Sequence, residues 1–164
     1  MREEQARIAT LADGWRVVRE LGAKTVMLDV EPLVSYWDGG QRSLDQGIAQ
    51  VLTEIAEIPG VVAVCFTTNS ARRPSAAPAY PGIRVTYLAS AYKPFRVDLY
   101  RDLPKPGVLI GDQVLTDGLL ALRLGYTFVQ YTPEQDGVPR RPWLLAQFGR
   151  AARPLLFRRS GRAK

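Results

Sequence analysis

Short, continuous apolar stretches alternate with longer amphipathic ones along this chain. The stretches KTVMLDV (24–30), VVAVCF (61–66) and GVLIGD (107–112) are rich in aliphatic and β-branched residues. Strands that are apolar on both faces are typical of parallel sheets covered by helices. The alternation therefore predicts an α/β fold: a three-layer sandwich around a mostly parallel, five-stranded sheet, in a single domain of residues 1–164.

Hydrophobic periodicity and turn residues predict the remaining elements. Two further strands are expected, at 83–88 near an edge of the sheet and at 126–132. A Pro-rich loop is expected at 71–82, and one or two helical turns at 94–103. Helices are expected at 3–21 with an interruption at 13–15, at 43–58 with Ser43 as N-cap, at 113–125 closed by Gly125, and at 141–153.

The composition removes several classes of function. The 164 residues include no His and a single Cys, Cys65. Ser-His-Asp and Cys-His catalysis are therefore excluded, as are thiolate zinc clusters and most other zinc sites. Any chemistry in this chain must use carboxylates, Lys, Arg, hydroxyls and hard metal ions.

The expected location is cytoplasmic. No apolar run approaches the roughly 20 residues that span a bilayer. The N-terminal stretch MREEQARIATLADGW lacks the apolar core of a secretion signal. Cys65 lies inside an apolar run, which fits a free thiol in a reducing compartment.

The basic residues are concentrated near the C-terminus. The net charge is +6, yet eight basic residues and no acid follow Asp136, and the other 14 basic residues face 16 acids. We expect residues 138–164 to form a basic, partly amphipathic tail, which is either solvated or attracted to an anionic membrane surface. Nucleic acid is not expected as a partner, because the remaining chain is slightly acidic and lacks interleaved aromatic and basic residues.

Polar residues stand where the predicted strands end. Each has an ordinary reading as a loop cap or a surface residue. In open α/β sheets, however, the carboxyl ends of the strands share one rim, where ligands bind. Carboxylates, hydroxyls and one ammonium group on one rim fit a hard divalent cation together with a phosphate. These residues are Asp29 and Glu31, then Thr67, Thr68 and Asn69, then Lys93, and finally Asp112 and Asp117.

The order of these motifs resembles the haloacid dehalogenase-like (HAD-like) phosphohydrolases, and most closely their YqeG-type, phosphatidylglycerophosphate-phosphatase-like branch. That branch reads D-L-D-N-T-L-V-x-W, then S-N-N, then K-P, then G-D-Q-x-x-T-D. The corresponding stretches here are DVEPLVSYW, TTNS, YKPF and GDQVLTD. The resemblance covers about residues 15 to 150 and implies a Rossmannoid sheet.

The resemblance also implies roles for single residues. Asp29 would be the nucleophile that forms an aspartyl-phosphate, and Glu31 the general acid. Thr67 would hydrogen-bond the transferring phosphoryl group, assisted by Thr68 and Asn69, and Lys93 would balance the negative charge. Mg²⁺ would be held by Asp29 and Asp112, by Glu31 through its backbone carbonyl, and by Asp117 in support.

The first motif departs from the pattern of the branch. Glu31 stands in place of Asp, and Leu33 in place of Thr. A displacement of about 1 Å in a reacting group can cost on the order of a hundredfold in rate. The alternative function is therefore a catalytically weak HAD-like domain that binds a phosphorylated ligand or a protein partner.

The spacing of the motifs leaves no room for a cap domain. One helix is expected between the first two motifs, and only a loop and a strand between the second and the third. An uncapped site is open to solvent, which favours a bulky or lipid-borne phosphate ester over a small enclosed metabolite.

Overall fold

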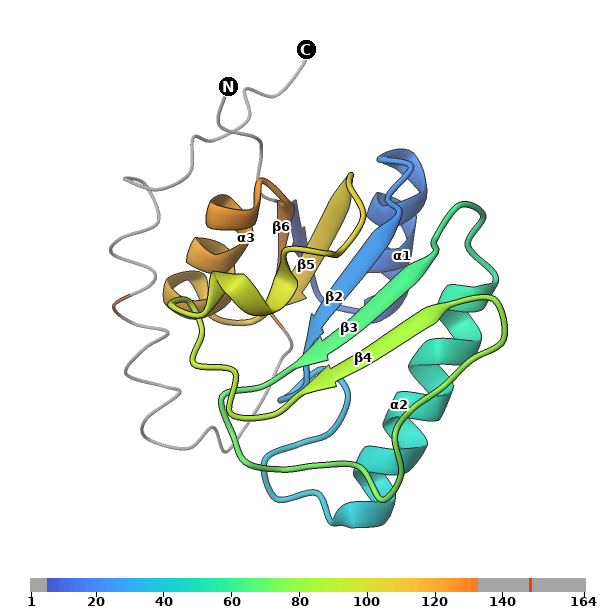
Figure 1. Cartoon of the computed structure of the whole chain (residues 1–164), viewed down its shortest axis with the longest axis vertical. Helices are drawn as coiled ribbons and strands as arrows, with labels where there is room; N and C mark the ends of the chain where they lie inside the picture. Colours follow the sequence, from blue (N-terminus) through green and yellow to red (C-terminus); the bar gives the residue numbers. More distant parts are fainter. Residues whose placement is uncertain (1–5, 133–147, 149–164) are drawn as a thin grey trace.

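The computed structural model of the chain describes residues 6–132 and Phe148. Its centre is a sheet of six parallel strands in the order β1-β6-β5-β2-β3-β4 (Figure 1). The strands are β1 (Ala6–Ile8), β2 (Thr25–Asp29), β3 (Ala63–Thr67), β4 (Arg84–Leu88), β5 (Gly107–Gly111) and β6 (Thr127–Tyr131). The helical elements are α1 (Leu11–Glu20), α2 (Gln41–Ala56), the 3₁₀ turn η1 (Val97–Tyr100), the π-helical turn η2 (Val114–Gly118) and α3 (Leu119–Leu124).

The α/β class and the parallel sheet are confirmed, whereas the expected count of five strands is wrong. The sixth strand is β1, in a segment expected to be helical. It pairs with β6, with Ala6 beside Val129 and Ile8 beside Tyr131. Three residues are too few for a periodic signal, so pairing with the sheet edge decides their conformation over local helical propensity.

Both long helices differ in detail from the expectation. The DGW stretch does not interrupt a helix but forms the first turns of α1, whose N-cap Thr10 accepts a hydrogen bond from the Asp13 backbone N–H at 3.3 Å. The N-cap of α2 is Gly40 rather than Ser43. The Ser43 hydroxyl instead lies 3.1 Å from the Ser35 hydroxyl, so it ties α2 to the loop that follows β2.

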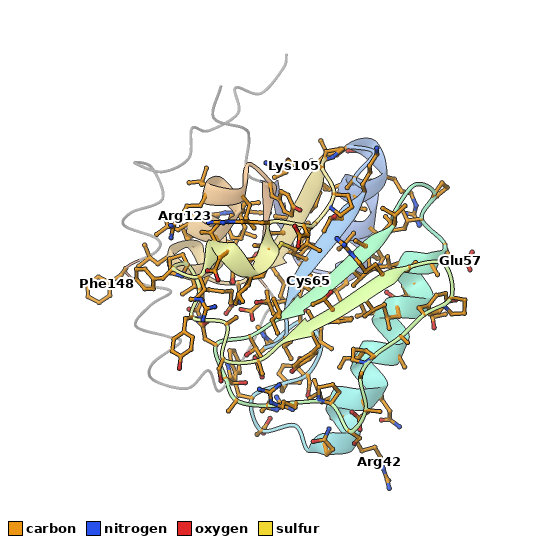
Figure 2. The ribbon with its side chains drawn as sticks, in the orientation of Figure 1. Arg42, Glu57, Cys65, Lys105, Arg123 and Phe148 are labelled. Atoms are coloured by element: carbon orange, nitrogen blue, oxygen red, sulfur yellow. The ribbon has the colours of Figure 1, made fainter. Side chains whose placement is uncertain are left out.

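Successive side chains of the central strands alternate between two hydrophobic clusters. Val26 and Leu28 of β2 belong to one cluster with residues of α1 and α2, while Met27 belongs to the other with residues of α3. This alternation is the period of a strand that is buried on both faces. Cys65 lies in β3 within the second cluster (Figure 2), and burial raises the pKa of its thiol to about 12.

The order in which the chain adds strands to the sheet changes direction beside β2. From β2 it proceeds through β3 to β4, and it then returns to β5 on the other side of β2 and continues to β6. At such a switch point two neighbouring strands send their connections in opposite directions, which opens a crevice at their carboxyl ends. Here the two strands are β2 and β5, in register from Thr25↔Gly107 to Leu28↔Ile110.

No helix within residues 6–132 is long and apolar enough to cross a membrane. The expected helix at 141–153 and the basic tail at 138–164 lie outside the described residues, except for Phe148, whose side chain is exposed (Figure 2).

Candidate functional site

Three carboxylates converge at the switch point. Asp29 is the last residue of β2, Asp112 directly follows β5, and Asp117 lies in η2. Each offers an oxygen, and these oxygens all lie within 4.8 Å of one another. The sequence predicted that Asp29 and Asp112 meet at one rim, and the structure brings them together there.

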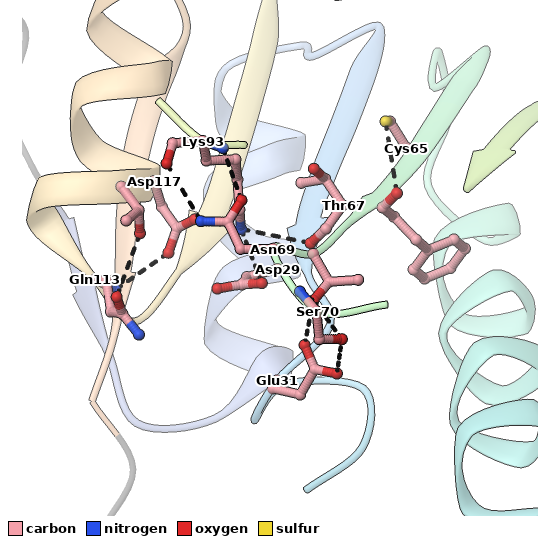
Figure 3. A network of polar contacts seen from close by, with 12 residues as sticks. Asp29, Glu31, Cys65, Thr67, Asn69, Ser70, Lys93, Gln113 and Asp117 are labelled. Atoms are coloured by element: carbon pink, nitrogen blue, oxygen red, sulfur yellow. Dashed lines mark hydrogen bonds and ion pairs between the residues drawn. The ribbon is translucent and has the colours of Figure 1, made fainter. Parts of the chain in front are cut away.

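Lys93 lies among these carboxylates with its ammonium group buried (Figure 3). Its Nζ is 2.8 Å from Asp29 Oδ1 and 2.7 Å from Asp117 Oδ1, and it donates to the Thr67 carbonyl at 3.4 Å. Burial alone would lower the pKa of Lys93, but Asp117 and Asp29 outweigh it and the pKa is raised. Lys93 is therefore a permanent cation at the site.

The loop after β4 delivers Lys93 by pairing with the loop after β3. The Lys93 backbone N–H donates to Asn69 Oδ1 at 2.7 Å, and Asn69 Nδ2 donates to the Lys93 carbonyl at 3.2 Å. Ser90 and Tyr92 adopt left-handed backbone conformations, with φ of 50° and 51°. Non-glycine residues rarely do so, and such strain is retained where the surroundings fix it. Asn69 thus positions Lys93 rather than reaching for a ligand.

Asp117 is fully buried and both of its oxygens are engaged. Oδ1 accepts from Lys93 Nζ, and Oδ2 accepts from the Gln113 backbone N–H at 3.2 Å. Gly111 makes room for it, because a Cβ at that position would lie 2.6 Å from Asp117 Cβ. The geometry gives Asp117 a supporting role, since it holds Lys93 and the turn that carries Gln113.

Asp29 and Asp112 are the carboxylates whose ionisation is unfavourable. Burial, then the charge of Asp117, raises the pKa of Asp29 well above its usual value, although Lys93 opposes the shift. The same two causes raise the pKa of Asp112 to about 7. In addition, Asp112 Oδ1 is buried and has no hydrogen-bond partner among residues 6–132 and Phe148. A buried oxygen without a partner is costly, so a bound cation would supply what the protein does not.

The hydroxyls of two adjacent threonines, Thr67 at the end of β3 and Thr68 directly after it, lie in different surroundings. The Thr67 hydroxyl is buried and lies 2.7 Å from the Tyr100 hydroxyl, outside the cavity at the site. Thr68 lines that cavity, and its hydroxyl donates to Glu31 Oε2 at 2.6 Å. Because neighbouring residues of an extended chain point to opposite faces, a shift of one position exchanges a core hydroxyl for a site hydroxyl.

The Glu31 carboxylate is not part of the three-carboxylate group. Oε1 accepts from the Ser70 hydroxyl at 3.1 Å and from Arg72 Nη1 at 3.2 Å, while Oε2 accepts from Thr68. Figure 3 shows Glu31 beside Ser70 and apart from Lys93 and Asp117. Leu33, which stands where the resemblance expected a hydroxyl, packs into the hydrophobic core.

A cavity of about 250 Å³ lies beside the carboxylate group and is lined by Asp29 and Lys93, but not by Asp112 or Asp117. Sequence reasoning found five of its lining residues: Asp29, Glu31, Thr68, Asn69 and Lys93. It missed the other five, Trp37, Ser70, Arg72, Gln113 and Thr116. These five lie in the loops after the strands and in the turn after β5, where their side chains follow no period. Only their closeness to the motif residues in the sequence could have indicated them.

Comparisons of this chain with protein-family models, curated proteins and solved structures gave no match.

Proposed function

We propose that the protein is a Mg²⁺-dependent phosphatase that hydrolyses a phosphate monoester through an aspartyl-phosphate on Asp29. The observation that carries this proposal is the convergence of three carboxylates and a buried lysine at the topological switch point. The HAD-like family and its three-layer sandwich belong to the proposal. They are supported by the motif order and by the two hydrophobic clusters on opposite faces of the sheet.

The residues present fit a magnesium ion. Three carboxylates and one ammonium group, all ionised, carry a formal charge of −2 (three negative, one positive), and Asp112 Oδ1 has no other partner in the region that the structure describes. Asp29 and Asp112 would hold the ion, together with the backbone carbonyl of Glu31, with Asp117 in support. When bound, Mg²⁺ would neutralise the charge of the phosphate and favour the ionised form of both ligating carboxylates.

The reaction uses the chain's own groups in two displacements. A carboxylate oxygen of Asp29 attacks phosphorus, an O–P bond forms, and the ester P–O bond breaks; the leaving alkoxide takes a proton from water in the open cavity. Water then attacks the phosphorus of the aspartyl-phosphate, which frees inorganic phosphate and restores the carboxylate. Lys93 favours the ionised form of Asp29 and holds it in place, and Thr68 and Ser70 would offer hydroxyls to the phosphoryl oxygens in exchange for their bonds to Glu31.

Turnover of a generic aryl phosphate with and without Mg²⁺ tests the proposal. We expect Mg²⁺-dependent turnover that Asp29→Asn abolishes without unfolding the protein, because an amide keeps the shape but cannot attack phosphorus. Asp38→Asn is the matched control, since Asp38 is an exposed acid of the following loop. Wild-type turnover in Asp29→Asn would remove Asp29 from its assigned role.

The second candidate is a HAD-like domain that binds a phosphorylated ligand or a protein partner with little or no hydrolysis. The position of Glu31 favours it, because that carboxylate is bonded to Thr68, Ser70 and Arg72. Mg²⁺-dependent binding of phosphate without turnover of any aryl phosphate would select this candidate.

Three further expectations remain proposals. We propose a cytoplasmic location, and an anionic membrane surface that attracts the basic tail at 138–164. We also propose a bulky or lipid-borne phosphate ester as substrate, which the open cavity accommodates without a cap domain.

A further inference from the structure

The tryptophan that closes the first motif has no part in the proposed reaction. Trp37 is partly buried and lines the same cavity as Asp29 and Lys93. We propose that Trp37 determines specificity for the organic group of the phosphate ester by offering an aromatic face to a planar ring, and that Arg72 holds Trp37 in place. The inference rests on the proposed function for the phosphate end of the cavity.

The composition of the cavity wall singles out Trp37. Among the described residues that line the cavity, nine carry polar or charged side chains, and Trp37 is the tenth. The polar and charged side chains are suited to bind a phosphate and its counter-ion. Among the described residues of the lining, Trp37 carries the one aromatic ring, on which a planar portion of a ligand can bury surface, so we infer that the indole decides which organic groups are favoured.

Arg72 fixes the backbone on both sides of Trp37. Its Nη1 donates to the Tyr36 carbonyl at 2.9 Å, and its Nη2 donates to the Gly39 carbonyl at 2.7 Å. Nη2 also donates to the Ser35 hydroxyl at 3.1 Å. A planar guanidinium with several simultaneous bonds fixes direction as well as distance, which a lysine could not do.

Glu31 completes this arrangement by fixing the guanidinium itself. It pairs with Arg72 Nη1 at 3.2 Å, and its side chain is only 7% exposed. The ion pair joins the loop after β2 to the loop after β3, across the mouth of the cavity. Glu31 therefore helps to hold the same side of the cavity as Arg72. This contact is a structural reason why the Glu31 carboxylate lies apart from the three carboxylates.

The loop that carries Trp37 is also held by hydrogen bonds and close packing within the loop itself. The backbone N–H groups of Val34 and Ser35 both donate to the Val30 carbonyl, at 2.8 and 3.1 Å. A Cβ on Gly39 would lie 2.5 Å from Ser35 Oγ, so the turn is closely packed. A wall held in its binding position before the ligand arrives loses little conformational freedom on binding.

An indole ring distinguishes planar from saturated groups. Aromatic rings stack or pack edge-to-face on indole and gain energy beyond the area they bury, whereas a small alkyl group gains only contact area. The ligand class is therefore a phosphate ester of an aromatic alcohol, or one that carries a ring next to the phosphate.

Two phosphonates that cannot be hydrolysed test the inference by calorimetry on the full chain with Mg²⁺. We expect wild type to bind phenylphosphonate about tenfold more tightly than methylphosphonate. Trp37→Ala should abolish this preference, because phenylphosphonate should lose more affinity than methylphosphonate does, and Trp37→Phe should retain most of the preference. Tyr36→Ala is the matched control, because Tyr36 is 55% exposed and does not line the cavity.

Arg72 is tested through the same ratio. Arg72→Lys keeps the charge but not the planar guanidinium, so it should reduce the phenyl preference, measured as the ratio of the two affinities in the folded variant. Its melting temperature should fall, because the hydrogen bonds to the Tyr36 and Gly39 carbonyls are lost. An unchanged preference in Trp37→Ala, or an equal loss of affinity for both phosphonates, would overturn the inference. A phenyl preference without turnover of any phosphate would overturn only the hydrolytic function. If wild type bound neither phosphonate, both proposals would fall.

Discussion

At the scale of single residues, the acids of the site differ in the groups with which they form hydrogen bonds. Asp117 is satisfied by Lys93 and Gln113, whereas one buried oxygen of Asp112 has no partner within the described part of the chain. Glu31 is satisfied by Arg72, Ser70 and Thr68. Three acids with similar chemistry therefore have different surroundings, and of the three Asp112 is the one we propose as a metal ligand.

Glu31→Gln tests whether Glu31 holds Arg72 in place or acts as a catalytic acid. Loss of the charged hydrogen bond to Arg72 should lower the free energy of unfolding by about 1–2 kcal/mol, measured by urea denaturation. Any residual turnover should fall equally for alkyl and aryl phosphates. A loss confined to alkyl phosphates, whose leaving groups need a proton, would instead restore Glu31 as the general acid.

Without Mg²⁺, stability should fall as the pH rises from about 4 to 7. Asp112, with its pKa raised to about 7, holds a proton in the folded protein that it loses in the unfolded chain over this range. The folded state then binds more protons than the unfolded state, so the free energy of unfolding decreases with pH, by up to a few kcal/mol at roughly 1.4 kcal/mol per pKa unit. The raised pKa of Asp29 makes the free energy of unfolding decrease with pH in the same direction.

Melting temperatures of wild type and Asp112→Asn across this range check the pH dependence. The variant should show a smaller slope, because an amide does not titrate. A wild-type stability that rises steadily between pH 4 and 7 in the absence of divalent ions would contradict the expectation.

At the scale of elements, the loops that follow the strands are bonded to one another. The Thr68 N–H donates to the Leu88 carbonyl and the Ala91 N–H donates to the Thr68 carbonyl, both at 2.9 Å. On the other side of the site, η2 begins three residues after Gly111, which packs closely against Asp117. The site is therefore assembled from loops that constrain each other, and a disturbance in one should reach the next.

Gly111→Ala should test this coupling. The added methyl group would lie 2.6 Å from Asp117 Cβ, so Asp117 must move away from Lys93. We expect a loss of about 1–3 kcal/mol of stability, as is typical of overpacking, together with weaker Mg²⁺ binding by calorimetry. Gly40→Ala is the matched control, because no atom lies within 4 Å of the position of its added Cβ. Equal behaviour of the two variants would argue against the coupling.

At the scale of the whole molecule, charge is unevenly distributed along the chain. Eight of the 22 basic residues follow Asp136 without a neighbouring acid. Clustered cations are attracted to anionic surfaces over about 8–10 Å at physiological salt. We therefore expect the basic segment to attract the protein to an anionic membrane surface.

Removal of residues 138–164 should weaken binding to anionic vesicles. We expect the full chain to sediment with phosphatidylglycerol vesicles at low salt, with about 1 kcal/mol contributed by each cation near the surface, and to be released as salt is raised. Circular dichroism checks that the shortened chain remains folded. Equal sedimentation of the two folded proteins at low salt would exclude a role for the tail.

The sequence by itself determined the α/β class, the central strands and the residues at their carboxyl ends. Apolar stretches such as VVAVCF have no stable alternative to burial, and acids that end neighbouring parallel strands must share a rim. Left-handed Gly125, with φ of 69°, likewise ends α3 as its position predicted. Local rules sufficed in these places because local propensity and global packing agree.

Only the tertiary structure decided the rest. The three residues of β1 carry no periodic signal and become a strand because the edge of β6 offers hydrogen bonds. The hydroxyl of Thr67 contacts Tyr100 in the core, whereas that of Thr68 contacts Glu31 in the cavity, because the two side chains leave the end of β3 on different faces. Arg72 lies 41 residues beyond Glu31, and only the fold brings the two together. Contacts between distant segments leave no trace in local periodicity, so such partners become visible only once the chain is folded.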